Sequence, residues 1–248
     1  MQYDDLLQLV AKRRSVRAFK SDPVPDEYID KIIEVARWAP SGANTQPWEF
    51  VVIRDKKLKD KIVDILAEDE VTSHKMEMTR EPELRHPGPA NRKPGARPNY
   101  ANAPVLILVC GDHRTKEGMT VNAIYNHGPD GLQHFASGLA SAFLYIQLAA
   151  TSLGLGSRWV SAVNNPLPQV QIKQLLGIPK EVMVYDMTPI GYPAPLPASE
   201  QRMRARRKAE EMTHRDGYEK AKYRTAEQIR EFLKKVHGRE GARLGGRR

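Results

Sequence analysis

The sequence has a single cysteine and no long apolar run, and both features limit what the protein can be. Because Cys110 is alone, no disulfide can form within the chain, which is typical of proteins from a reducing compartment. The longest apolar run, at 103–110, is far too short to cross a bilayer. The first residues, which include Asp4 and Asp5, lack the basic and then apolar layout of a secretory signal. We therefore expect a cytoplasmic protein without membrane association.

Motifs for several self-sufficient chemistries are also missing. There is no Gly-x-x-x-x-Gly-Lys-Ser/Thr run for a nucleoside triphosphate, no His-Glu-x-x-His or cysteine pair for zinc, and no Gly-x-Ser-x-Gly elbow of a hydrolase. The pair Gly154-x-Gly156 lacks the third glycine of a dinucleotide fingerprint and follows an expected helix. We expect no metal site, and we expect a cofactor to carry any enzymatic chemistry.

The net charge of +9 comes from one end of the chain. Residues 202–248 hold 16 Lys and Arg against 7 Asp and Glu, whereas residues 1–201 hold 23 of each sign. Basic residues in a terminal arm, rather than on a folded face interleaved with aromatics, argue against a nucleic-acid reader. No nucleic-acid partner is expected, although binding of nucleic acid or of an acidic membrane by this arm stays open.

Hydrophobic periodicity predicts helices and strands along a single domain of residues 1–248. The continuous apolar character of 104–110 indicates a central strand, and the apolar helix at 130–152 is expected in a core or at a dimer interface. Asp26 and Asp130 are the expected N-caps of their helices. The expected helices are 4–12, 26–37, 56–66, 130–152 and 169–176, and the expected strands are 49–54, 104–110, 159–163 and 182–190.

This periodicity is lost between residues 67 and 102. Five prolines interrupt the segment, and charges of both signs stand between them. We expect a long insertion, for which an active-site lid and a passive loop are the two alternatives.

The densest group of anion-binding side chains is Arg13-Arg14-Ser15-Val16-Arg17. Guanidinium groups bind phosphate oxygens bidentately, and a hydroxyl adds a further donor. A solvated basic surface would have the same residues, so this stretch alone does not decide the function. The loop at 39–47, rich in small residues and amides, is the second candidate region.

These two stretches resemble the signatures of the FMN-dependent nitroreductase family. The first reads Arg13-Arg14-Ser15-Val16-Arg17-x-Phe19, and the second runs from Ala39-Pro40-Ser41-Gly42-Ala43-Asn44 through Gln46-Pro47-Trp48 to Phe50. The likeness continues, in the family's order, with Gly154–Ser157, Pro189–Pro193, and Arg206-Arg207-Lys208 with Glu211, His214 and Tyr218.

The resemblance implies an α+β fold with a central, mainly antiparallel sheet flanked by helices, in an intertwined homodimer with FMN at the dimer interface. By the family pattern, Arg13 and Ser15 would bind the flavin phosphate, and Arg206 or Arg207 would close the site from the C-terminal arm (202–248). Arg17 would lie at the pyrimidine edge of the ring, and the backbone at 160–161 near flavin N5. The full set of implied cofactor-binding residues is Arg13, Arg14, Ser15, Arg17, Pro40, Ser41, Gly42, Asn44, Gln46, Val160, Ser161, Ile190, Gly191, Arg206 and Arg207.

The reaction that the resemblance implies is a ping-pong transfer of hydride through flavin N5. NADPH or NADH is the implied donor, and a small aromatic acceptor such as a nitroaromatic or a quinone is then reduced. No side chain is expected to act as a covalent catalyst, because positioning and flavin electrostatics suffice.

Alternatives remain within and beyond this family. Glu68-Asp69-Glu70 before the insertion resembles the lid of iodotyrosine-deiodinase-like members, which would make the protein a reductive dehalogenase of halogenated phenols or tyrosines. Ser73 and His74 stand where those members have a tyrosine, and a solvated helix end would have the same acidic run. A flavin-binding protein with little turnover, flavin destruction to a benzimidazole, and a basic-arm interaction protein also stay open.

Overall fold

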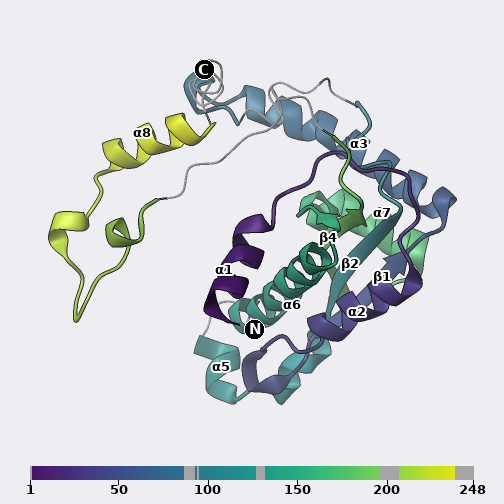
Figure 1. Ribbon diagram of the computed structural model, residues 1–248, viewed down its shortest axis with the longest axis horizontal. Coiled ribbons are helices and arrows are strands. Elements are labelled where there is room, and N and C mark those ends of the chain that lie inside the picture. The colour runs from purple at the N-terminus through teal and green to yellow at the C-terminus, as the bar shows by residue number, and fades with distance from the viewer. Residues whose placement is uncertain (1, 87–92, 94, 127–131, 196–206, 238–248) are drawn as a thin grey trace. The chain divides into compact units, whose positions relative to one another are not determined.

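The computed structural model describes residues 2–86, 93, 95–126, 132–195 and 207–237. The described chain divides into two compact units, Met1–Asp69 with Arg97–Pro195 and Glu70–Ala96 with Leu196–Arg248. The single domain expected from the sequence stays a prediction. The elements shown in Figure 1 are α1 (Tyr3–Lys12), α2 (Asp26–Ala36), η1 (Gly42–Asn44), β1 (Trp48–Ile53), α3 (Lys56–Met78), η2 (Pro82–Leu84), β2 (Val105–Asp112), η3 (His113–Gly118), α5 (Val121–Asn126), α6 (Leu132–Ser152), β3 (Gly156–Ser157), η5 (Ala162–Asn164), α7 (Pro166–Leu176), β4 (Val182–Gly191), η7 (Ala209–Glu211), η8 (Lys220–Lys222) and α8 (Ala226–His237).

The first unit is built on an antiparallel sheet with strand order β1-β2-β4-β3. Strand β2 lies between β1 and β4 and is buried from Val105 to Gly111. A strand that is buried on both faces has no solvent side to favour polar residues, which explains its continuous apolar sequence. The predicted α+β class, the mainly antiparallel sheet and the central position of this strand are confirmed.

Helices cover both faces of this sheet. Alternate residues of β2 point to opposite faces, so Val105, Ile107 and Val109 join a core with α2 and α6. Leu106, Leu108 and Cys110 join a second core with α3 and α7. The sheet is therefore the middle layer of the first unit (Figure 1).

Helix α6 is the central helix of the first core. Ten of its residues are buried, among them Phe135, Leu139, Phe143 and Ile146. By length and composition it is also the one helix among the described residues that could cross a membrane, but 56% of its apolar window is buried inside the protein. A buried core helix passes the same test, so the expected core position of the helix is confirmed. The expected cap, Asp130, lies outside the described residues.

Three local predictions are wrong. Helix α3 does not stop at Leu66 but continues to Met78, so the first part of the expected insertion is helical. The expected strand at 159–163 is one bridge, between Val160 and Met187, followed by η5. Asp26 is the first residue of α2 rather than its N-cap, because Pro25 has the cap position.

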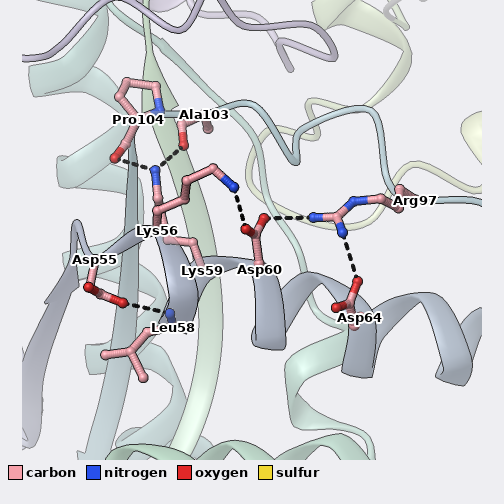
Figure 2. A network of polar contacts seen from close by, with 9 residues as sticks. All are labelled: Asp55, Lys56, Leu58, Lys59, Asp60, Asp64, Arg97, Ala103 and Pro104. Carbon is pink, nitrogen blue, oxygen red and sulfur yellow. Dashed lines mark hydrogen bonds and ion pairs between the residues drawn. The ribbon is translucent and has the colours of Figure 1, made fainter.

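Polar contacts attach the end of the insertion to the start of α3 (Figure 2). The Lys59 ammonium donates to the carbonyl oxygens of Ala103 and Pro104 at 2.9 and 2.8 Å. The Arg97 guanidinium pairs with Asp60 and Asp64 at 2.8 and 3.0 Å. The chain that leads into β2 is therefore fixed to α3 before it enters the sheet.

Candidate functional site

The basic segment Arg13–Arg17 leaves the end of α1 and runs beside β3. Ser15 forms a parallel bridge with Ser157, and the Val16 N–H donates to the Ser157 carbonyl at 2.9 Å. Glycine at position 156 makes this approach feasible, since a Cβ there would lie 2.6 Å from Val16 Cγ2. The segment therefore has a fixed extended path on the sheet edge.

The polar groups of this region suit a phosphate. Arg13 and Arg17 are half-buried, and Arg14 and Ser15 are exposed. The buried Ser157 hydroxyl beside them has no hydrogen-bond partner within the described part of the chain. Buried hydroxyls are normally paired, so such an atom is expected where a ligand completes the site. Guanidinium and hydroxyl donors together fit the phosphate group of FMN.

Ile190 and Gly191 lie in the strand next to this segment. In the register of β3 and β4, Ser157 is opposite Ile190 and Gly156 is opposite Gly191. The Ile190 side chain is fully buried in the core, and Gly191 packs so tightly that a Cβ would lie 2.5 Å from Pro104 Cδ. These two predicted residues are therefore beside the basic segment, but the Ile190 side chain points into the core.

Val160 and Ser161 follow β3 and turn back onto β4. The Val160 N–H donates to the Met187 carbonyl at 2.9 Å, and the Met187 N–H donates to the Val160 carbonyl at 3.1 Å. These bonds use both backbone groups of Val160, which leaves Ser161, an exposed residue, as the better donor to a ligand. Because Met187 is three residues before Ile190 in β4, this turn belongs to the same end of the sheet.

The loop at 40–47 packs on a different part of the first unit. Ala43, Asn44 and Gln46 have positive φ values of 50°, 53° and 45°, which non-glycine residues rarely adopt. The Gln46 N–H donates to Ser41 Oγ at 3.0 Å, which holds this conformation.

Helix α6 packs against the same loop. Gly42 lies over His134, and Ser41 Cβ is 3.1 Å from where a Cβ on Gly138 would be. Pro40 is exposed, as are Asn44 and Gln46. Strained backbone that the surrounding structure enforces is common at binding sites.

The two arginines predicted from the C-terminal arm have different outcomes. Arg206 lies outside the described residues. Arg207 belongs to the second unit, where its guanidinium donates to the Glu211 carbonyl at 2.6 Å and lies 3.7 Å from the Glu211 carboxylate. Its expected role at the phosphate stays a prediction.

Asp186 is a buried acid that the sequence reading missed. Its carboxylate accepts from Trp159 Nε1 at 2.6 Å, and its side chain is 5% exposed. Burial raises the pKa of Asp186 to about 6, and the Trp159 and Ser161 side chains oppose this rise. The available signal was one acidic residue inside the apolar stretch 182–190.

No group of three or more His, Cys, Asp or Glu side chains in the described ranges is placed to hold a metal ion.

The arrangement of a basic segment, a short strand and a strained loop around an antiparallel sheet can be compared with known proteins. The sequence model described as "Nitroreductase family" matches residues 10–192. The chain belongs to the nitroreductase family. The family that the sequence motifs predicted is thus confirmed.

Individual members of the family extend this comparison. Iodotyrosine deiodinase 1 of Rattus norvegicus is 33% identical over 200 residues, which cover 78% of this chain and 64% of the rat protein. A protein of Methanothermobacter thermautotrophicus, provisionally named NADH dehydrogenase/NAD(P)H nitroreductase, is 29% identical over 197 residues, covering 79% of this chain and 81% of its own. The chain therefore spans less than two thirds of the rat relative.

A solved structure shares the fold of this nitroreductase family member. A crystal structure of oxidized iodotyrosine deiodinase bound to FMN and 3-iodo-L-tyrosine superposes with a TM-score of 0.64 at 26% identity. The match covers 86% of this chain and 99% of the deiodinase chain. The similarity to deiodinase members, inferred above from the acidic run before the insertion, is thus confirmed as a relationship in sequence and fold.

Proposed function

We propose that this protein binds FMN and reduces a small electron-poor aromatic acceptor, such as a nitroaromatic or a quinone, with NADH or NADPH as the electron donor. The observation that carries the proposal is the Arg13–Arg17 segment, fixed beside the buried, unpartnered hydroxyl of Ser157. These side chains form a preformed set of hydrogen-bond donors for a phosphate at the β3 edge of the sheet. The FMN in the deiodinase structure supports the same cofactor.

In this proposal the chain binds and orients, and FMN when bound supplies two-electron chemistry at its N5 atom. Arg13, Ser15 and the Ser157 hydroxyl hold the phosphate. Arg17 places a fixed positive charge at the pyrimidine edge, where it stabilises the negative charge of the reduced ring. Ser161 presents its N–H toward the reacting edge.

We further propose that the working form is a homodimer in which each flavin contacts both subunits. The loop at 40–47 and the basic segment are then halves of a site that two copies complete. Exposed apolar side chains on α1 support a second copy as the cover, since Tyr3, Leu7 and Val10 are 74%, 52% and 49% exposed. Both the dimer and the cytoplasmic location stay predictions.

Purification and anaerobic titration test this function. The protein should be yellow and release FMN on denaturation, in a ratio near one per chain. NADH or NADPH should bleach the flavin, and a nitroaromatic or a quinone should restore its colour. A protein that neither retains nor rebinds FMN would overturn the proposal, and FMN that neither nucleotide reduces would overturn the choice of donor.

A second candidate is reductive dehalogenation of halogenated phenols or tyrosines. The similarity to deiodinases, one of them with bound 3-iodo-L-tyrosine, favours it. Within the acidic run before the insertion, the Asp69 carboxylate accepts a hydrogen bond from the Asn165 amide at 2.7 Å. Dithionite-reduced protein that releases iodide from 3-iodotyrosine, but is not reoxidised by nitroaromatics, would favour this candidate over the first.

A further inference from the structure

The Asp186 carboxyl is an anomaly in the strand that contains it. Its neighbours at the end of β4, from Met187 to Gly191, are all buried, and the side chain itself is 5% exposed. A buried carboxyl is costly unless it forms hydrogen bonds that repay its desolvation. Packing alone therefore does not account for an acid at this position, and its hydrogen-bond partners are informative.

The side chains that face it belong to one short loop. The Trp159 indole N–H donates to Asp186 Oδ2 at 2.6 Å, whereas Oδ1 is buried without a hydrogen-bond partner in the described part of the chain. The Ser161 side chain of the same loop helps to lower the pKa of this carboxyl against the effect of burial. Between them, Val160 exchanges two backbone hydrogen bonds with Met187, the residue after Asp186. Two consecutive residues are thus bonded to two consecutive residues of β4, and Ser161 follows them directly.

A second contact fixes the indole from the other side. The Trp159 ring packs on the Phe143 ring of α6, with centroids 4.1 Å apart and planes inclined by 34°. The indole is therefore held between a carboxyl on the sheet and an aromatic ring on the core helix. When both the plane and the N–H of the indole are fixed, the backbone that follows Trp159 also has little freedom to move.

We propose that Asp186 is a positioning residue that holds Trp159 in place and thereby sets where the N–H of Ser161, two residues further on, meets the flavin. This rests on the proposed function, because Ser161 is the exposed residue of that turn and the flavin is its expected ligand. Asp186 does not touch the ligand in this proposal. It acts through the loop, by its hydrogen bond to the Trp159 indole rather than by its charge.

Four variants separate this role from general damage to the core. Asp186→Leu removes the acceptor, whereas Asp186→Asn keeps one for the indole. Trp159→Phe keeps a ring against Phe143 but removes the donor. Thr188→Val is the matched control, since Thr188 is also buried in β4, two residues on, and its hydroxyl forms only a long bond of 3.3 Å to the Pro189 carbonyl.

Two readouts follow the loop. The first is Trp159 emission of the apoprotein, obtained as the difference from Trp159→Phe. We expect it to shift in Asp186→Leu and not in Thr188→Val. The second is FMN affinity, measured by quenching of flavin fluorescence. We expect Asp186→Leu and Trp159→Phe each to weaken binding about tenfold, the double variant no more than either one, and Asp186→Asn to restore most of the affinity.

Each result has one meaning. Unchanged Trp159 emission in Asp186→Leu would overturn the hydrogen-bonded loop. Changed emission with wild-type FMN affinity in Asp186→Leu would overturn its role at the flavin, and equal loss in Asp186→Asn and Asp186→Leu would show that charge acts instead of position. If the wild-type protein binds no FMN, the proposed function fails, while the emission of the apoprotein still tests the loop.

Discussion

At the scale of single residues, burial changes the acid–base chemistry of Asp186. Burial raises its pKa from 3.8 to about 6, so the folded state holds a proton that the unfolded state releases. Its contribution to stability is then complete below about pH 4 and is lost as the pH rises through 6. Asp186→Asn cannot ionise, so it should gain about 2 kcal/mol relative to wild type between pH 4 and pH 8.

Urea unfolding of both proteins across this range measures that difference. The two free energies of unfolding should diverge mainly between pH 4 and pH 6. Parallel curves would contradict a raised pKa. Glu34→Gln is the matched control, since that carboxyl is exposed beside Arg37, which lowers its pKa, and its variant should show no gain at alkaline pH.

Cys110 gives a second prediction at this scale. It is fully buried in β2, and burial, with a smaller contribution from the negative charge of Glu49, raises its pKa to about 12. Since only the thiolate is a good nucleophile, a maleimide at pH 8 should label less than a tenth of the native protein in an hour. In denaturant, one thiol per chain should react within minutes. Rapid labelling of the native protein would contradict the burial.

Residues of the candidate site could be proposed from the sequence where local motifs suggest them, and their role at a flavin stays a prediction. The Arg13–Arg17 segment and the loop with Ser41 and Gln46 were singled out from their own composition. Asp186 was not, because its proposed role depends on Trp159, a residue 27 positions away that only the fold brings to it. The unpartnered hydroxyl of Ser157 was also invisible, since burial and pairing are properties of the tertiary structure.

At the scale of elements, hydrophobic periodicity predicted the helices and strands that bury a regular apolar face and missed the segments that do not. Strands β1, β2 and β4 and helices α2 and α6 were found within a few residues, because each buries a regular apolar face. Helix α3 was cut short because its fully buried residues end at Ala67, and the extension beyond that residue has no buried apolar stripe. The prediction of a strand at 159–163 was wrong although Val160 and Val163 are buried, because these apolar residues lie in a turn and in η5 instead of a strand.

Lysines at the start of α3 give a prediction for this element. Lys59 is half-buried and donates to two carbonyls at 2.9 and 2.8 Å, whereas the Lys56 side chain is 86% exposed in its pair with Asp60 (Figure 2). Lys59→Met should lower the free energy of unfolding by about 1–3 kcal/mol, because two carbonyls lose a charged donor. Lys56→Met, the matched control, should cost less than about 0.5 kcal/mol. Equal costs in urea unfolding would contradict a structural role of Lys59.

At the scale of the whole molecule, the order of the motifs predicted the family, whereas the homodimer that would share each flavin between two subunits stays a prediction. The basic segment lies beside β3, and the strained loop packs on α6. If one flavin needs the segment of one subunit and the loop of the other, damage to either half should be complementable by a second chain with damage to the other half.

Two variants test this arrangement. Arg13→Ala removes a phosphate ligand from the basic segment. Asn44→Gly with Gln46→Gly removes two amides from the loop, and glycine tolerates the positive φ of 53° and 45° at these positions. Each homodimer should bind little FMN. A heterodimer isolated with two different affinity tags pairs an intact segment with an intact loop at one of its two sites, so it should bind about one FMN per dimer. If both halves of the site lay in one chain, every site of that heterodimer would remain damaged, and its flavin content would stay at the level of the homodimers.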